Sequence, residues 1–148
     1  MKGTGNRELR ITNYELIVIL KRYNMSKLFL VIASIFGGLS VMAGAFGSHY
    51  LKGQLTPPLL EIFTTATRYQ MYHALALLFV GILFNRSETP QPWLIAAGWA
   101  FITGIGLFSG SLYALSLTGM GWLGMITPIG GIALICGWAC LTIASLKS

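Results

Sequence analysis

Long apolar runs alternate with short polar breaks along the chain, and this pattern predicts its elements. Four runs reach the roughly 20 helical residues that are needed to cross the hydrocarbon core of a membrane. They are residues 28–49, 62–84, 93–117 and 122–146. The second run is mainly apolar only from Met71 to Phe84, and it reaches sufficient length when it is extended back through Arg68. The pattern predicts an all-α fold, a four-helix transmembrane bundle that runs up-down-up-down.

Composition supports a membrane protein. Of the 148 residues, 55% are hydrophobic and only 9% are charged, whereas charged residues make up about 25% of ordinary soluble domains. The chain contains no aspartate, and its four glutamates lie outside the most apolar stretches. This composition excludes an ordinary soluble domain.

The net charge of +6 predicts an orientation and not a nucleic-acid partner. Five of the ten Lys and Arg residues precede residue 25, and the others are scattered singly without a basic stripe. Most basic residues near the spans fall on one predicted side, while Lys52 and Arg68 fall on the other. Those on the first side are Lys21, Arg22, Lys27, Arg86 and Lys147. Because cytoplasmic loops carry an excess of Lys and Arg, we expect both termini to be cytoplasmic.

Residues 1–24 differ from the rest of the chain. Their apolar stretch, "YELIVIL", is too short to cross a membrane and is flanked by charge. Met25, directly before the first span, resembles a natural start. We therefore expect residues 1–24 to be a flexible cytoplasmic tail or a misassigned upstream extension, and residues 25–148 to form the membrane domain.

Four polar or glycine-rich stretches are predicted to lie at one depth of the bundle. Because successive spans run in opposite directions, "GAFGSH" (44–49), "RYQMYH" (68–73), "FSGSLY" (108–113) and "TPIGG" (127–131) all fall in the outer half of the membrane. Ionisable residues in a membrane often mark a functional site. We therefore expect an outward-facing polar pocket. Its candidate residues are His49, Arg68, Tyr69, Gln70, Tyr72, His73, Ser109, Ser111, Tyr113 and Thr127.

The same stretches also have a structural interpretation. Small residues let membrane helices approach closely, and this can account for Gly44, Gly47, Gly110, Gly130 and Gly131. Pro128 should leave the Gly124 carbonyl without its helical partner and so kink the fourth span. Arg68 could extend to the membrane surface or pair with Glu61, and either histidine could be neutral and hydrogen-bonded. Packing and pocket remain open as alternatives.

No arrangement of residues indicates an enzyme. A nucleophilic serine needs an adjacent base that a third group orients, and the only carboxylate near the polar layer is Glu61. We predict no metal site and no cofactor, although His49 and His73 could in principle hold a haem between helices. Cys136 and Cys140 are four residues apart, and we interpret them as small residues at a helix interface.

Several motifs resemble one known family. "GAFGSH", "YQMYHALALL", "LFSGSLYAL", and "TPIGG" followed by "GW" resemble, in order and spacing, the YgdD-like family of small bacterial inner-membrane proteins. The family is catalogued as a domain of unknown function and is similar to small mitochondrial membrane proteins. The resemblance implies a four-helix integral protein of the bacterial inner (plasma) membrane. It implies no activity, substrate or catalytic residue.

These observations favour an accessory or scaffold protein that packs against other membrane components or lipid. The expected partners are the lipid bilayer and a membrane protein or a second copy of the chain. The alternative is a small-solute or proton transporter or channel that uses the polar pocket around His73 and Arg68.

Overall fold

The computed structural model describes residues 13–87 and 91–147, and every regular element in these ranges is a helix. Four long helices follow the order of the predicted runs. Their bounds are α1 Asn13–His49, α2 Pro57–Arg86, α3 Pro92–Thr118 and α4 Thr127–Leu146. Two short 3-10 helices, η1 (Leu51–Gly53) and η2 (Gly121–Met125), lie in the connections. The all-α prediction is confirmed for the described residues.

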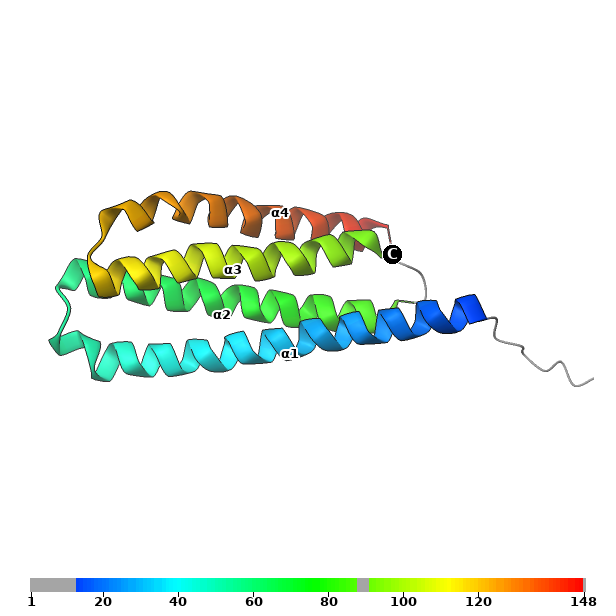
Figure 1. Cartoon of the computed structure of the whole chain (residues 1–148), viewed down its shortest axis with the longest axis horizontal. Coiled ribbons are helices and arrows are strands. Elements are labelled where there is room, and N and C mark those ends of the chain that lie inside the picture. Colours follow the sequence, from blue (N-terminus) through cyan, green and yellow to red (C-terminus); the bar gives the residue numbers. More distant parts are fainter. Residues whose placement is uncertain (1–12, 88–90, 148) are drawn as a thin grey trace, which may run out of the picture.

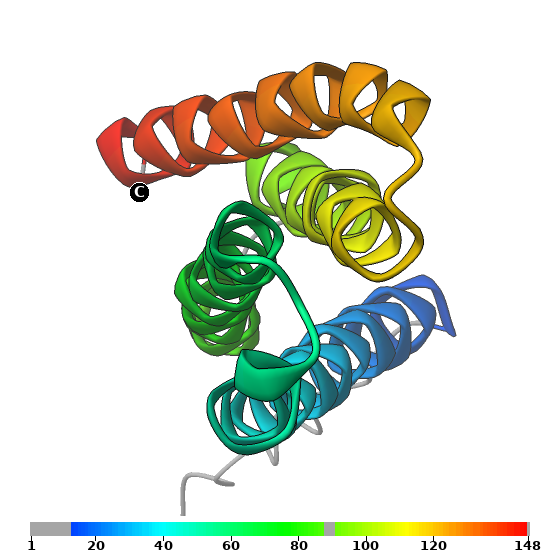
Figure 2. The same cartoon turned by 90° about the vertical axis from the view of Figure 1, so that its left-hand side faces the viewer.

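The helices pack in chain order. Figure 1 shows that successive helices run in opposite directions along the long axis of the molecule. α2 packs against α1 and α3, and α3 packs against α4. α1 and α4 therefore lie on opposite sides of the α2–α3 pair, as Figure 2 shows. We call the end that holds η1 and η2 the connection end, and the end where α3 begins and α4 ends the terminal end.

Local chemistry accounts for several helix boundaries. α2 begins at Pro57 and α3 at Pro92, because proline has a helical φ and the amide it lacks would have no partner in a first turn. α3 ends where Gly119 adopts a left-handed φ of 71°. The Gly119 amide donates to the Leu115 carbonyl (2.8 Å), which caps the helix.

α1 is longer than the first predicted span. It begins at Asn13 and not near Leu28, so residues 13–24 of the segment that we expected to be a tail or an extension continue the first helix. An α-helix forms its own backbone hydrogen bonds and can continue past the hydrocarbon layer. Residues 1–12 of that segment lie outside the described residues.

In the described part of the chain, three helical stretches are long and apolar enough to cross a membrane. They are Leu16–Gly53, Pro92–Thr118 and Gly121–Leu146. The second predicted span, residues 62–84, is not among them, although α2 is 30 residues long. The reason lies in its sequence, because Arg68, Gln70 and His73 interrupt the apolar run of α2. Length and composition therefore select three of the four predicted spans.

The predicted kink at Pro128 is wrong. α4 begins at Thr127, so Pro128 lies in its first turn and not in its interior. The amides of a first turn have no intrahelical acceptor, and a proline there removes no hydrogen bond. Residues 122–125, which we expected to begin the span at 122–146, belong to η2 instead.

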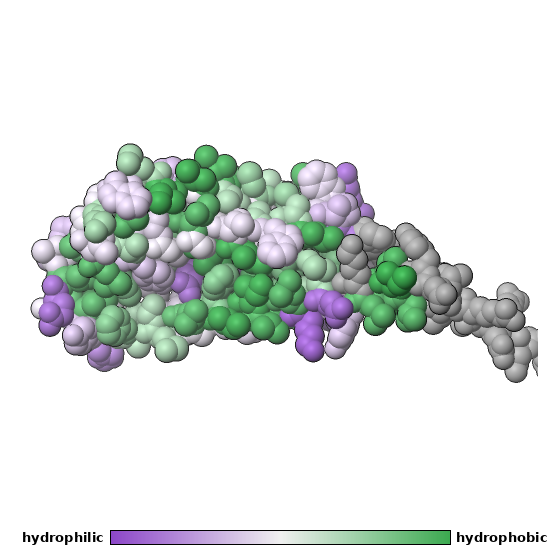
Figure 3. Space-filling model, viewed as in Figure 1, coloured by the Kyte–Doolittle hydropathy of each residue, from purple (hydrophilic) through white to green (hydrophobic). Residues whose placement is uncertain are grey.

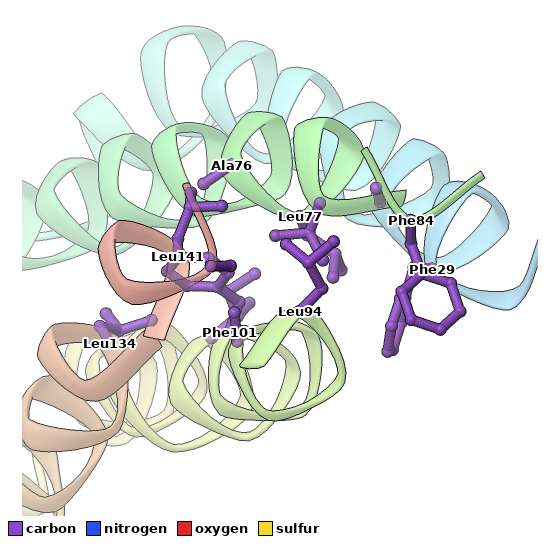
Figure 4. Close-up of a cluster of buried hydrophobic side chains, with 13 residues drawn as sticks. Phe29, Ala76, Leu77, Phe84, Leu94, Phe101, Leu134 and Leu141 are labelled. Atoms are coloured by element: carbon purple, nitrogen blue, oxygen red, sulfur yellow. The ribbon is translucent and has the colours of Figure 1, made fainter. Parts of the chain in front are cut away.

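Aromatic rings packed on glycine form much of the core. Phe29 of α1 and Phe101 of α3 are fully buried. A Cβ atom on Gly98 would stand 2.5 Å from the Phe29 ring, and one on Gly137 would stand 2.6 Å from the Phe101 ring. Figure 4 shows both rings among the buried leucines of the core. Each ring fills the space that a side chain on the facing helix would occupy.

Candidate functional site

Two polar side chains join α1 to α2 in the connection-end half of the bundle. The Ser40 hydroxyl donates to the Thr67 carbonyl (2.8 Å), and Gln70 Nε2 donates to the Phe36 carbonyl (2.8 Å). Both side chains are buried. A carbonyl has two lone pairs, so these acceptors can also serve their own helices. Gln70, a predicted pocket residue, is therefore engaged in a helix–helix contact.

Tyr113 links α3 to the same part of α2. Its hydroxyl donates to Thr67 Oγ1 (3.3 Å), and its ring packs against the Phe63 ring with centroids 4.9 Å apart. Thr67 thus connects α1, α2 and α3, although we did not predict it as a site residue. A threonine that bonds back to its own helix, as Thr67 does to the Phe63 carbonyl, is common and gives no distinctive sequence signal.

Ser111 and Thr127 join α3 to α4. Their hydroxyl oxygens lie 2.9 Å apart, and the Ser111 hydroxyl also lies 3.0 Å from the Phe108 carbonyl. Close by, a Cβ atom on Gly130 would overlap the backbone of Phe108, so the backbones of the two helices are in contact there. Gly131 faces the Phe108 ring, with 3.7 Å from a Cβ position to the nearest ring atom. These residues bring α3 and α4 together near the start of α4.

His73 lies between α2, α3 and α4 in an aromatic environment. It is buried, and its ring centroid is 5.8 Å from that of Phe101 and 6.2 Å from that of Trp138. Its Nδ1 atom lies 2.7 Å from the Tyr69 carbonyl. A carbonyl only accepts, so Nδ1 carries the hydrogen and Nε2 is the basic nitrogen of the neutral ring. The ring of Tyr69 stacks on that of Phe108, with centroids 4.7 Å apart.

The structure does not bring the ten predicted pocket residues into one pocket. His49, at the end of α1, is exposed. Gly47 faces Phe63 of α2, so His49 lies level with the first turns of α2. His73 is about 15 Å further along that helix than Phe63. Arg68 and Tyr72 are exposed on α2. The predicted residues are therefore divided between the helix contacts and the surface.

Ser109 differs from the other buried polar residues of the described ranges in its hydrogen bonding. Its side chain is 1% exposed, and its hydroxyl has no hydrogen-bond partner in the part of the chain that the structure describes. Ser109 is thus buried inside the bundle, as a pocket residue would be, but it is not hydrogen-bonded to any other predicted pocket residue.

The predicted packing glycines fall into two groups. Gly47 and Gly130 are buried against a neighbouring helix, and Gly44 is in ordinary contact with Thr67. Gly110 is exposed, and no neighbouring atom lies within 4 Å of its Cβ position. Sequence reasoning missed Gly104, where a Cβ atom would overlap the Leu134 side chain. Such a contact depends on which faces of the helices meet, which the spacing of glycines along one helix does not reveal.

Two hollows lie on either side of the α1–α2 contact. The first, the α1–α3 groove, has a volume of about 570 Å³ and is mostly apolar. Its lining includes Leu39, Met42, Gln70, Gly106, Gly110 and Tyr113. The second, the Arg68 pocket, has a volume of about 290 Å³ between α1 and α2. It is lined by Gly44, Gly47, Ser48, Leu60, Phe63, Thr64, Thr67 and Arg68.

The outer surface of the bundle suits a membrane. Figure 3 shows mainly hydrophobic and near-neutral residues along the middle of one face, with hydrophilic residues gathered toward its two ends. Exposed apolar side chains occur on all four helices, for example Met42, Phe79, Leu107 and Ile135. Such a surface is expected where lipid replaces water around the protein.

Within residues 13–87 and 91–147, no group of three or more His, Cys, Asp or Glu side chains is placed to hold a metal ion. Cys136 and Cys140 are free, the first exposed and the second half-buried on α4.

Comparison with known proteins identifies a family of membrane proteins. Residues 43–131 match the family described as "Protein of unknown function (DUF423)". A UPF0382 membrane protein of Staphylococcus aureus and one of Staphylococcus epidermidis are each 45% identical to the chain over 121 residues, which is 82% of this chain and 97% of the relative. The UPF0382 membrane protein YwdK of Bacillus subtilis is 41% identical over 121 residues, 82% of this chain and 98% of the relative.

No solved structure matches the chain. The bacterial relatives are named membrane proteins, and three stretches of the structure are long and apolar enough to span a bilayer. The predicted location in a bacterial membrane is therefore confirmed, as is the expectation of a family without an assigned function. The chain belongs to the DUF423 family, whose curated relatives are called UPF0382 membrane proteins.

Proposed function

We propose that the protein is an accessory membrane protein that packs laterally against another membrane protein through the α1–α3 groove. The observation that carries this proposal is the open face of α3. Gly106 and Gly110 line the groove, and no neighbouring atom of the described ranges lies within 4 Å of either Cβ position. Small residues four apart let a helix backbone approach closely. We also propose that, within this family, the chain is a YgdD-like protein.

We further propose that all four helices cross the membrane. The α1–α2 contacts define two levels along the bundle. Near the connection end, the Cβ position of Gly44 lies 3.5 Å from Thr67, and near the terminal end Ser26 Oγ lies 3.4 Å from Asn85 Oδ1. Between these levels, α1 and α2 present residues 26–44 and 67–85. Both lengths are close to the roughly 20 residues that a transmembrane helix needs.

α3 and α4 present similar lengths. At the connection end, Ser111 bonds Thr127. At the terminal end, Lys147 Nζ lies 5.2 Å from the centre of the Trp93 ring. Residues 93–111 and 127–147 lie between these contacts, again close to the ~20 residues of a membrane crossing. The shared length supports an up-down-up-down crossing in which α2 is held as the fourth span by its neighbours.

The distribution of basic residues supports cytoplasmic termini. Arg86 ends α2 and Lys147 follows α4 at the terminal end, and Lys27 is next to Ser26, which bonds Asn85 there. Of the Lys and Arg residues in the described ranges, only Lys52, in η1, and Arg68, beside Thr67, lie toward the connection end. In the sequence, Lys21 and Arg22 also precede the membrane-crossing part of α1. The positive-inside tendency then favours the terminal end as the cytoplasmic one, in the plasma membrane of a bacterium.

The occupant that we propose for the groove is a transmembrane helix of a different protein. A lipid chain can fill an apolar groove, but it gains little from glycine in particular. A helix about 10 Å across gains dispersion contacts along its length when it approaches a wall without side chains. Leu39 and Met42 of α1, both exposed, form the opposite wall.

Site-specific photocrosslinking in bacterial cells tests this function. A photoreactive amino acid at Met42, which is 68% exposed in the groove, should form an adduct with one membrane protein. The matched control is Ile135, which is 69% exposed on α4 and outside the groove lining. We expect lipid adducts there. Gly110→Leu should suppress the Met42 adduct without unfolding the protein.

Two outcomes would contradict the proposal. One is that Met42 reacts only with lipid or with a second copy of the chain. The other is that the protein adduct persists at full yield with Gly110→Leu, because a side chain at that position would then not obstruct the partner.

His73 supports a second candidate function, a proton or small-solute transporter or channel. Buried histidines in membrane helices often mark proton pathways, and within the described residues no hydrogen bond joins Nε2 of His73 to a neighbouring helix. Arg68, however, lines the α1–α2 side of α2, while His73 packs toward α3 and α4. In proteoliposomes, a pH-dependent flux that His73→Ala abolishes would support transport. A wild-type protein without flux would remove this candidate.

A further inference from the structure

Arg68 lies near one limit of the membrane-crossing part of α2. The rise from Arg68 to Arg86 is about 27 Å at about 1.5 Å per residue, which is close to the roughly 30 Å thickness of the hydrocarbon core. No Lys, Arg, Asp or Glu lies between them. If α2 crosses the membrane as proposed, the two arginines lie near the opposite limits of the hydrocarbon core, and their long side chains can extend toward the lipid phosphates.

Arg68 also lines a hollow between α1 and α2. The Arg68 pocket has glycine on its α1 side, at Gly44 and Gly47, and the absence of side chains there lets α1 lie close to Thr67 and Phe63. The α2 side presents the hydroxyl of Thr64 and the ring of Phe63. The pocket therefore combines a cation, hydroxyl groups and an apolar wall.

Within residues 13–87 and 91–147, the guanidinium of Arg68 has no hydrogen-bond or ion-pair partner. The Arg68 side chain is exposed. Glu61, the nearest acidic residue in sequence on α2, lies about 10 Å away along the axis and lines a different hollow with Thr65 and Leu112. An arginine at the edge of a membrane extends toward the headgroup region, where an anionic group can pair with it.

We propose that the Arg68 pocket binds the phosphate of an anionic phospholipid headgroup. The planar guanidinium presents paired N–H donors that match two phosphate oxygens. The hydroxyls of Ser48 and Thr64 now donate to the Ala45 and Leu60 carbonyls of their own helices, and they can rotate toward a phosphate oxygen. The apolar wall lies beside the first carbons of the lipid. The site rests on the proposed crossing of α2 but not on the α1–α3 groove.

A photoreactive phosphatidylglycerol tests the proposal with the full-length protein in nanodiscs. Adducts should map to residues 44–48 and 60–68. Equally reactive phosphatidylcholine should label these residues about tenfold less, because its choline cation repels Arg68 although its phosphate is the same. Arg68→Gln should reduce the phosphatidylglycerol adducts by a similar factor, while Arg68→Lys should retain part of them. Arg86→Gln, at the opposite end of α2, is the matched control and should leave them unchanged.

A second variant separates a pocket from simple attraction to a charge. Thr64→Leu keeps Arg68 and fills the hollow, so it should also reduce labelling. The proposal would be overturned if Thr64→Leu were labelled as strongly as the wild-type protein, or if the two lipids labelled the wild-type protein equally. Competition by inorganic phosphate at millimolar concentration would assign the site to free phosphate and would also overturn it. Thermal unfolding of each variant checks its fold, and the Met42 adduct reports separately on the groove.

Discussion

At the residue scale, glycines with the same sequence signature have opposite environments. Gly110 was predicted to pack, as was Gly130, because both lie in small-residue stretches of apolar helices. Gly130 lies against the backbone of Phe108, whereas Gly110 faces open space in the groove. Sequence spacing identifies a helix face that can be approached closely. It does not identify whether this chain or another component approaches it.

The contrast gives a first prediction. Gly130→Ala should lower the free energy of unfolding by about 1–3 kcal/mol, because the added methyl group forces α4 away from α3. Gly110→Ala, the matched control, should leave it unchanged or raise it by up to about 1 kcal/mol, because alanine is the better helix former. Unfolding of the purified variants in mixed detergent micelles measures both. Equal effects of the two substitutions would contradict the close contact at Gly130.

At the element scale, the order and type of the helices could be predicted, but two of their boundaries could not. Apolar runs reveal the part of a helix that lies in lipid, and α1 continues beyond that part to Asn13. Pro128 is compatible with either a kink or a helix start. The choice depends on whether the α-helix already includes the residues before Pro128. It does not, because residues 121–125 form the separate 3-10 helix η2.

The start of α4 gives a second prediction. If the hydroxyl contact holds α4 against α3, Ser111→Ala and Thr127→Val should be coupled in a double-mutant cycle. We expect a coupling energy of about 0.6 kcal/mol, the average for hydrogen bonds between membrane helices, and at most ~1.7 kcal/mol. Ser111→Ala with Thr142→Val is the control cycle, because Thr142 bonds only within α4, to the Trp138 carbonyl. Strict additivity of Ser111→Ala and Thr127→Val would show that the contact adds no stability.

At the scale of the whole molecule, depth in the bundle could be predicted better than position around it. Alternating helix directions correctly bring Tyr113 to the level of Thr67, and Ser111 to that of Thr127. They do not determine which side of a helix faces which neighbour. Gln70 therefore turns to α1 and His73 to α3 and α4, although the two residues are three positions apart. The predicted residues do not form one shared pocket for this reason, because residues at a similar depth lie in contacts with different helices.

Topology is a property of the whole chain, and α2 decides it. If all four helices cross, Lys52 and Lys147 lie on opposite sides of the membrane. If only the three stretches selected by length and composition cross, the chain returns after α2 on the side of Lys52, and α3 and α4 then bring Lys147 back to that same side. The two topologies therefore differ in the relative positions of two exposed residues.

Cysteine labelling distinguishes these topologies. In a Cys136→Ala/Cys140→Ala background, we expect a membrane-impermeant maleimide to label Lys52→Cys in intact cells and Lys147→Cys only after permeabilisation. The background without an added cysteine is the control for labelling of other proteins. Labelling of both variants in intact cells would show that α2 does not cross. The cost of placing the polar residues of α2 in lipid would then exceed the stabilisation from its packing against α1 and α3. The reverse pattern would retain four spans and place the terminal end outside, against the positive-inside tendency.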